Sequence, residues 1–198
     1  MPLALDAAAQ DLLFREAHTA RVFTDEPVTD EQIREIYDLI KFGPTAHNSS
    51  PLRITLIRTP EAKQRLLAHL METNRPKTAG APLAAILSVD LDFHEKLPEL
   101  FPVRPDLKED PAYADPDTRQ RNGTLSAALQ IGYFVLGVRA AGLAAGPMSG
   151  FDADGLNKEF FGDGRQQALV VVNIGHPAAT AYSPRLPRLA FEDAARVL

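Results

Sequence analysis

Small polar side chains gather between Gly43 and Pro51, where hydroxyl, amide and imidazole groups follow one another closely. Pro44 and Pro51 stiffen the two ends of this loop and remove two backbone donors. A loop of this kind can approach a polar ligand closely and offer it many hydrogen-bonding groups. The same residue types also make ordinary turns, so the loop alone leaves both interpretations open.

Pairs of basic and polar side chains are dispersed along the rest of the chain: Thr19 with Arg21, Asn74 with Lys77, and Arg185 with Arg188. Each pair alone is typical of a solvated surface. Taken together with the polar loop, they indicate a phosphate-bearing ligand that is rich in hydrogen-bonding groups. Arginine suits phosphate because it can donate two parallel hydrogen bonds, and asparagine suits an amide edge. His18 belongs with the first pair because its neighbours are basic.

Motifs of several other enzyme classes fail on spacing. Ser149 lies in Gly-Pro-Met-Ser-Gly, one residue away from the Gly-x-Ser-x-Gly spacing of a serine hydrolase. Gly162-Asp163-Gly164 lacks the third glycine of a dinucleotide fingerprint and follows a predicted helix. His94-Glu95 lacks the second histidine of a zinc hydrolase, and the histidines are scattered. The sequence therefore predicts no metal site and identifies no catalytic residue.

The composition is typical of a single globular domain spanning 1–198, with 45% hydrophobic and 24% charged residues. A formal net charge of −5 argues against nucleic acid or an anionic membrane as a general partner. The absence of cysteine excludes disulfides, thiolate nucleophiles and cysteine-ligated metals. Residues 1–18 lack the basic start of a secretory signal, and the longest uncharged run, 122–138, is too short and polar to span a bilayer. These features favour a cytoplasmic protein.

Hydrophobic periodicity predicts the elements that hold these residues. In the first half of the chain it predicts a helix over 6–18, a capped helix beginning at Thr29 with Tyr37 on its core face, and a helix beginning at Pro60. Strands are predicted over 52–58 and 82–89, and a polar turn over 74–77. Residues 92–116, rich in proline, are predicted to form a surface excursion that acts as a lid or a dimer arm.

In the second half, the longest helix is predicted to run from Asp115 or Asp117 to about Ala141, with Gly142 ending it. A tight loop is predicted over 143–151 and a short helix over 152–161. A buried strand is predicted over 168–174, and the tail is expected to end in a helical patch over 191–198. No internal repeat or second domain is visible.

Taken in order, these segments resemble the FMN-dependent nitroreductase family. The motifs are a basic segment at Thr19 and Arg21, Pro-Thr-x-x-Asn-Ser-x-Pro at 44–51, Asn-x-x-Lys at 74–77, Pro-x-x-Gly at 147–150 and Arg-Leu-Pro at 185–187. The resemblance covers nearly the whole chain. It implies an α+β fold, with a central, mainly antiparallel sheet flanked by helices, in an intertwined homodimer with FMN sites at the interface.

The resemblance also assigns cofactor-binding residues. It implies that Thr19, with His18, and Arg185 hold the FMN phosphate, and that Arg21, Asn74 and Lys77 line the pyrimidine edge of the flavin. It implies that Pro44, Thr45 and Asn48 come from the other subunit, and that the Ser149–Gly150 backbone reaches flavin N5. Ala17 and Ser183 stand where the family often has basic residues, and Arg188 is a candidate to compensate.

The runs 97–102, 146–152 and 185–189 resemble the branch of the family that contains malonic semialdehyde reductase. The resemblance implies that NADH or NADPH supplies a hydride, which passes through FMN N5 to a small acceptor, malonic semialdehyde, giving 3-hydroxypropanoate. A broad nitroaromatic or quinone reductase is the alternative enzyme, and a non-catalytic FMN-binding module is the alternative from another class. Residues around 100–104 are expected to line the acceptor pocket, and His47 has no assigned role.

Overall fold

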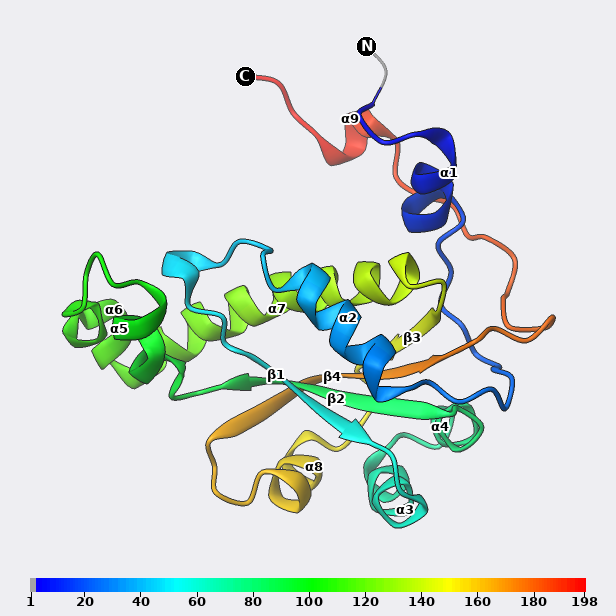
Figure 1. The fold of residues 1–198 in the computed structure, drawn as a ribbon, viewed down its shortest axis with the longest axis horizontal. Helices are drawn as coiled ribbons and strands as arrows, with labels where there is room; N and C mark the ends of the chain where they lie inside the picture. The colour runs from blue at the N-terminus through cyan, green and yellow to red at the C-terminus, as the bar shows by residue number, and fades with distance from the viewer. Residues whose placement is uncertain (1–2) are drawn as a thin grey trace.

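A four-stranded antiparallel sheet forms the centre of the computed structural model, which describes residues 3–198 (Figure 1). The strand order is β1-β2-β4-β3, and every neighbouring pair is antiparallel. The strands are β1 (Leu52–Ile57), β2 (Leu83–Asp90), β3 (Ala144–Met148) and β4 (Gln166–Gly175). The predicted α+β class with an antiparallel central sheet is confirmed. Met1 and Pro2 of the predicted 1–198 domain lie outside the described residues.

Helices cover both faces of this sheet (Figure 1). The α-helices are α1 (Ala7–Gln10), α2 (Asp30–Ile40), α3 (Pro60–His69), α4 (Arg75–Ala79), α5 (Leu97–Leu100), α6 (Pro111–Ala114), α7 (Pro116–Ala140), α8 (Ala153–Phe160) and α9 (Phe191–Ala194). A π-helical turn, η1 (Asp11–Arg15), continues α1. Short 3₁₀ turns occupy η2 (Ala46–Asn48), η3 (Phe93–Lys96) and η4 (Leu107–Glu109).

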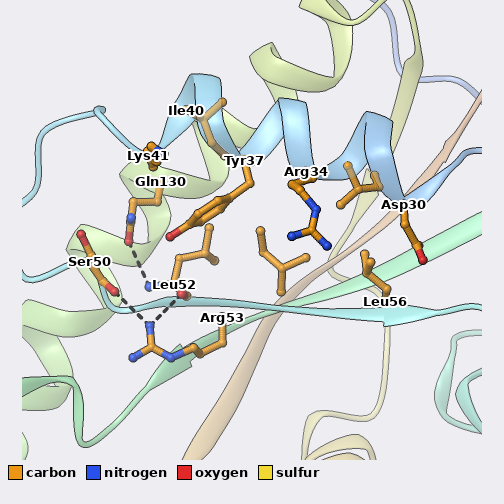
Figure 2. Close-up of a pocket in the computed structure, with 12 residues that line it drawn as sticks. Asp30, Arg34, Tyr37, Ile40, Lys41, Ser50, Leu52, Arg53, Leu56 and Gln130 are labelled. Atoms are coloured by element: carbon orange, nitrogen blue, oxygen red, sulfur yellow. Dashed lines mark hydrogen bonds between the residues drawn. The ribbon is translucent and has the colours of Figure 1, made fainter. Parts of the chain in front are cut away.

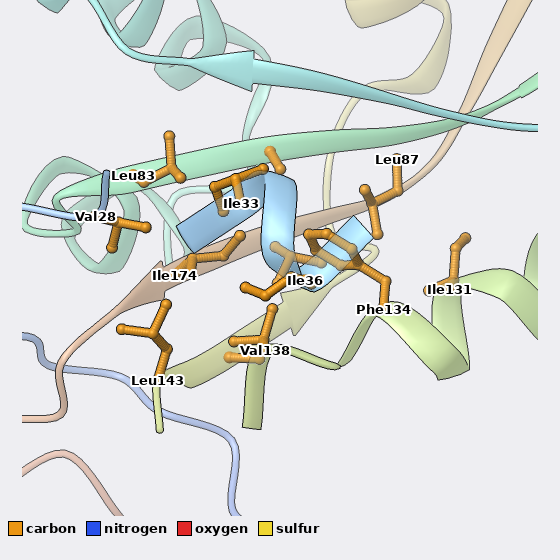
Figure 3. Packing of buried hydrophobic residues seen from close by; sticks show 13 residues of the cluster. Val28, Ile33, Ile36, Leu83, Leu87, Ile131, Phe134, Val138, Leu143 and Ile174 are labelled. Carbon is orange, nitrogen blue, oxygen red and sulfur yellow. The ribbon is translucent and has the colours of Figure 1, made fainter. Parts of the chain in front are cut away.

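The main core lies between the sheet and the pair α2 and α7 (Figure 3). Phe134 of α7 and Ile36 of α2 are almost fully buried there, against Leu87 and Ile174 of the sheet. A second core lies on the opposite face, where α3 and α8 contribute Leu66 and Leu156. Because both faces are covered, all eight residues of β2 are buried, as the missing alternation in its sequence predicted.

Local sequence signals set the helix ends. The Thr29 hydroxyl accepts from Gln32 N, and Gln32 Oε1 accepts from Thr29 N, which is the predicted capping box of α2. Asp115 caps the start of α7. Gly142, at φ 75°, ends α7 in a Schellman arrangement, since Leu143 N donates to Val138 O. These predicted boundaries are confirmed.

Several predicted elements are wrong. Residues 144–148 are strand β3 and not a loop, and β3 tolerates Pro147 because it is an edge strand. Residues 75–79 are helix α4 and not a turn. The predicted first helix ends at Arg15 rather than His18, and only Phe191–Ala194 of the tail is helical. Tyr37 is 53% exposed and does not face the core.

The 92–116 excursion is folded and packs on itself. Phe93, Leu97, Leu107 and Tyr113 form a separate buried cluster within it. The Arg119 side chain of α7 ties the excursion down, donating to Leu91 O and Tyr113 O. No helix within residues 3–198 is long and apolar enough to cross a membrane.

Candidate functional site

Basic side chains from the segment after η1, from α7 and from the C-terminal tail converge on a cavity of about 550 Å³. We call it the arginine cavity; its lining is Ala17, His18, Thr19, Arg21, Val135, Arg139, Ala145, Pro147, Ser183, Pro184, Arg185, Leu186 and Arg188. The lining holds four arginines and no aspartate or glutamate. In a chain of formal net charge −5, this concentration of positive charge marks a site for an anion.

Strand β3 and the C-terminal tail hold the basic segment of the cavity in place. Ala20 N donates to Ala145 O of β3, and Arg21 N donates to Ala181 O of the tail. The segment runs very close to β3, because a Cβ on Gly146 would lie 2.6 Å from Ala20 O. Thr19 and Arg21 are exposed on either side of the buried Ala20. The contacts therefore orient both side chains toward solvent and the cavity.

Arg185 brings the tail onto the same segment. Its Nη1 donates to Ala17 O, and its Nη2 lies 2.9 Å from His18 Nε2. Since a guanidinium only donates, His18 accepts through Nε2 and carries its ring proton on Nδ1. The His18 ring is stacked on Tyr182, with ring centroids 5.0 Å apart. Three of the predicted phosphate-binding residues, His18, Thr19 and Arg185, thus share one cavity.

A second group of predicted residues lies just beyond β3. Asn74 Nδ2 donates to Gly150 O at 3.0 Å, and Lys77 Nζ donates to Asn74 Oδ1 at 3.2 Å. Gly150 is required here, because an added Cβ would lie 2.7 Å from Asn74 Nδ2. The backbone from Pro147, which lines the arginine cavity, reaches Gly150 in three residues, at most about 11 Å. Ser149 lies between them, so the two groups form adjoining parts of one region.

The third group, Pro44, Thr45 and Asn48, does not line the arginine cavity. Asn48 Nδ2 donates instead to Leu100 O of α5 at 2.9 Å, and Tyr133 OH donates to Pro44 O. The Thr45 hydroxyl accepts from Ser50 N within the loop. The loop is therefore held by the excursion and by α7, apart from the other predicted cofactor residues.

The loop has an unusual backbone. His47, Asn48 and Ser50 all have positive φ, at 50°, 52° and 42°, although none of them is glycine. Such residues are costly and persist where neighbouring structure fixes them. His47 is fixed through its side chain, since its Nδ1 lies 2.6 Å from Tyr113 OH and its ring packs edge-on against Phe101. The excursion thus holds the loop in a strained conformation.

A separate groove of about 680 Å³ runs between α2 and the edge strand β1 (Figure 2). Its lining includes Tyr37, Arg34 and Lys41 from α2, with Arg53 and the aliphatic residues of β1 opposite. Gln130 of α7 closes one end, where its Oε1 accepts from Leu52 N. Ser50 is shared between this groove and the loop. None of the predicted cofactor-binding residues lines it.

Arg139 is the cavity residue that sequence reasoning missed. It lies in the last turn of α7, a helix whose preceding 17 residues carry no charge, so the helix was interpreted only as a packing element. The signal that could have found it is this lone arginine at the end of an apolar run. Among residues 3–198, no group of three or more His, Asp or Glu side chains is placed to hold a metal ion.

The chain has an antiparallel α+β fold, and its arginine cavity lies beside the pair Asn74 and Lys77. These features define a class of protein with a candidate site for an anionic ligand that forms hydrogen bonds. Residues 14–176 match the Nitroreductase family. A Streptomyces coelicolor protein named "Putative NADH dehydrogenase/NAD(P)H nitroreductase" is 62% identical over 193 residues, covering 98% of this chain and 97% of its own. The chain belongs to the Nitroreductase family.

Solved structures show the same fold. A Staphylococcus epidermidis protein described as a "putative NAD(P)H:FMN oxidoreductase" superposes with a TM-score of 0.84 at 19% identity, covering 100% of this chain and 99% of that one. An Exiguobacterium sibiricum "putative nitroreductase in complex with FMN" superposes with a TM-score of 0.81 at 18% identity, with coverage of 100% and 99%.

Proposed function

We propose that the chain is an NAD(P)H-dependent FMN oxidoreductase that delivers a hydride to a small acceptor. The observation that carries the proposal is the arginine cavity, whose lining gathers four guanidinium groups; Glu16 Oε2, 3.9 Å from Arg185 Nη2, offsets part of this charge. A phosphate monoester is the natural ligand of such a cavity, because arginine pairs with it through short, charge-assisted hydrogen bonds. The names of the relative and the superposed structures support the same cofactor and donor.

The remaining donors suit the other end of the same molecule. Asn74 and Lys77 offer an amide and an ammonium beside the Ser149–Gly150 backbone, and Gly150 O accepts from Asn74 Nδ2. An amide and a cation match the carbonyl and imide groups of a flavin ring. The residues present therefore fit FMN, with its phosphate among His18, Thr19 and Arg185.

FMN held by these residues would supply the hydride chemistry between a nicotinamide donor and the acceptor. The chain supplies orientation and charge. Arg21 and Lys77 provide the positive charge that stabilises electron density on the ring, and this effect is larger where water is excluded. Asn74 fixes Lys77 through its Oδ1 and fixes Gly150 through its Nδ2. We assign no general acid, and water supplies the proton.

We propose a homodimer in which Pro44, Thr45 and Asn48 reach the FMN of the partner subunit. Their position apart from the arginine cavity supports this, since within one chain Asn48 and Pro44 contact the excursion and α7 instead. Strand β1 is an open edge beside the groove that it forms with α2, and Leu39 and Phe42 at the end of α2 are 61% and 80% exposed. An open edge with an exposed apolar flank is a surface that a second chain would cover.

For the acceptor we propose malonic semialdehyde, whose aldehyde carbon would take the hydride and whose oxygen would take a proton to give 3-hydroxypropanoate. Three motifs, at 97–102, 146–152 and 185–189, support this branch. The 92–116 excursion would act as a lid or dimer arm, with residues 100–104 lining the acceptor pocket. The alternative is a broad nitroaromatic or quinone reductase; the Streptomyces coelicolor relative carries "NAD(P)H nitroreductase" in its name.

One experiment on FMN-loaded protein tests these assignments. NADH and NADPH are added without oxygen, bleaching of the flavin is followed, and turnover of malonic semialdehyde is compared with that of a nitrofuran. We expect bleaching and faster turnover of the semialdehyde. Faster turnover of the nitrofuran would establish the alternative enzyme. Bound FMN that no nicotinamide bleaches would establish a non-catalytic FMN-binding module, and a protein that refuses FMN would overturn the proposal.

A further inference from the structure

Arg139 is a buried cation that makes no recorded ion pair. Its side chain is on α7, the residue is only 7% exposed, and it lines the arginine cavity. Within residues 3–198, no carboxylate oxygen lies within 4.0 Å of its guanidinium, whereas Arg185 in the same cavity has Glu16 Oε2 at 3.9 Å. A buried charge needs a compensating partner, because removal from water is costly.

Part of this compensation comes from the N-terminal helix. Arg139 Nε donates to Leu12 O at 2.8 Å, and Nη2 donates to Leu12 O and to Glu16 O. These carbonyls belong to the C-terminal end of the α1–η1 helix, which carries about half a negative charge. Nη1 has no recorded acceptor among the described residues, so one end of the guanidinium is left for another partner.

The surroundings of Arg139 call for a negative charge. Arg21, Arg185 and Arg188 line the same cavity, and like charges in a shared, partly dry space raise one another's energy. Ala17 and Ser183, which also line the cavity, are small and carry no charge. A doubly charged phosphate would satisfy the free Nη1 and relieve the repulsion among the arginines.

We infer that Arg139 is a phosphate-binding residue: one edge of its guanidinium anchors the α1–η1 helix, and the other end binds the FMN phosphate from the buried side of the cavity. This inference rests on the proposed FMN-binding function and adds to it a ligand that comes from α7. In this arrangement Arg139 contacts both the α1–η1 helix and the phosphate. Binding of the phosphate and anchoring of the helix are therefore coupled.

The test compares FMN with riboflavin, which differ only in the phosphate. Apo-protein is titrated with each flavin by fluorescence quenching, for the unmodified chain, Arg139→Gln and Arg139→Lys. We expect Arg139→Gln to lower the FMN-to-riboflavin affinity ratio about tenfold or more, since a hydrogen bond to a charged group is lost. Arg139→Lys keeps the charge and should retain most of the ratio.

Arg119→Gln is the matched control. Arg119 is another α7 arginine, half-buried, that donates to backbone carbonyls, but it lies at the opposite end of the helix, outside the cavity. We expect this variant to lose thermal stability and to keep the affinity ratio. The Arg139 variants are checked for folding by their melting temperatures without flavin.

Two outcomes would overturn the inference and leave the proposed function standing. One is an FMN-to-riboflavin affinity ratio that is the same in Arg139→Gln and in the unmodified chain. The other is an equal loss of FMN and riboflavin affinity in both Arg139 variants, which would show that the residue only supports the helix. If the unmodified chain binds neither flavin, the proposed function itself fails, and the inference fails with it.

Discussion

Lys77 is the residue whose charge matters most to the proposed chemistry. Its Nζ donates to Asn74 Oδ1 at 3.2 Å, which positions the ammonium, and it makes no ion pair within residues 3–198. We expect Lys77→Met to slow flavin reduction by NADH about tenfold or more, because a positioned cation no longer stabilises the electron-rich ring. Stopped-flow absorbance measures this rate. Lys158→Met, which removes an exposed lysine of α8, is the control, and an unchanged rate in Lys77→Met would remove Lys77 from the site.

At the scale of elements, the 92–116 excursion is bonded to the polar loop over 43–51, and we call this contact the clasp. Its central contact joins Tyr113 OH to His47 Nδ1 at 2.6 Å. We expect Tyr113→Phe to reduce the free energy of unfolding by about 1 kcal/mol and to speed amide exchange in the loop, because a hydrogen bond that holds strained backbone is lost. Denaturant unfolding and hydrogen exchange measure the two effects.

Tyr37→Phe is the matched control. It also removes a tyrosine hydroxyl, but Tyr37 lines the groove between α2 and β1, and its hydroxyl makes no hydrogen bond within residues 3–198. It should leave both measurements unchanged. A Tyr113→Phe protein whose loop exchanges at the original rate would show that the clasp does not hold the loop.

The excursion also carries a pH-sensitive residue. Burial, and secondarily Arg119, lower the pKa of His94 from its ordinary value of 6.5, although Asp92 and Glu95 act in the opposite direction. As the pH drops, His94 therefore binds a proton near pH 6.5 in the unfolded chain but only at a lower pH in the folded chain. The free energy of unfolding falls as the pH drops through this range, because the unfolded chain binds more protons there. We expect His94→Gln to lose less melting temperature between pH 8 and pH 5 than the unmodified chain. Parallel losses in the two proteins would contradict this.

The elements that were predicted correctly are those with strong local signals. Thr29 and Gln32 set the start of α2, and Gly142 sets the end of α7, through contacts a few residues apart. Strand β3 was missed because Gly146 and Pro147 are poor strand formers, and its stability comes from pairing with β4 more than twenty residues later. The site residues stay a prediction, although the motif residues His18, Thr19, Arg21 and Arg185 do line one cavity; Arg139 joins that cavity only through tertiary packing.

At the scale of the whole molecule, the proposal requires two chains. We expect sedimentation to give a dimer, and a double variant, Leu39→Asp with Phe42→Asp, to raise the dimer dissociation constant about thirtyfold or more, because charges replace exposed apolar anchors. FMN affinity should fall with it, since each site would lose the partner's loop. Gln64→Asp with Ala68→Asp, on exposed positions of α3 across the sheet, is the control. A flavin-loaded monomer would contradict the shared site.

The separation of the polar loop from the arginine cavity has a genetic consequence. If each site takes its cavity from one chain and its loop from the other, Arg185→Ala and Asn48→Ala damage different halves of it. Mixing the two inactive proteins would form heterodimers in which one site collects both lesions and the other has none. Two defective alleles would then complement each other, and a cell carrying both would recover activity that neither allele provides alone.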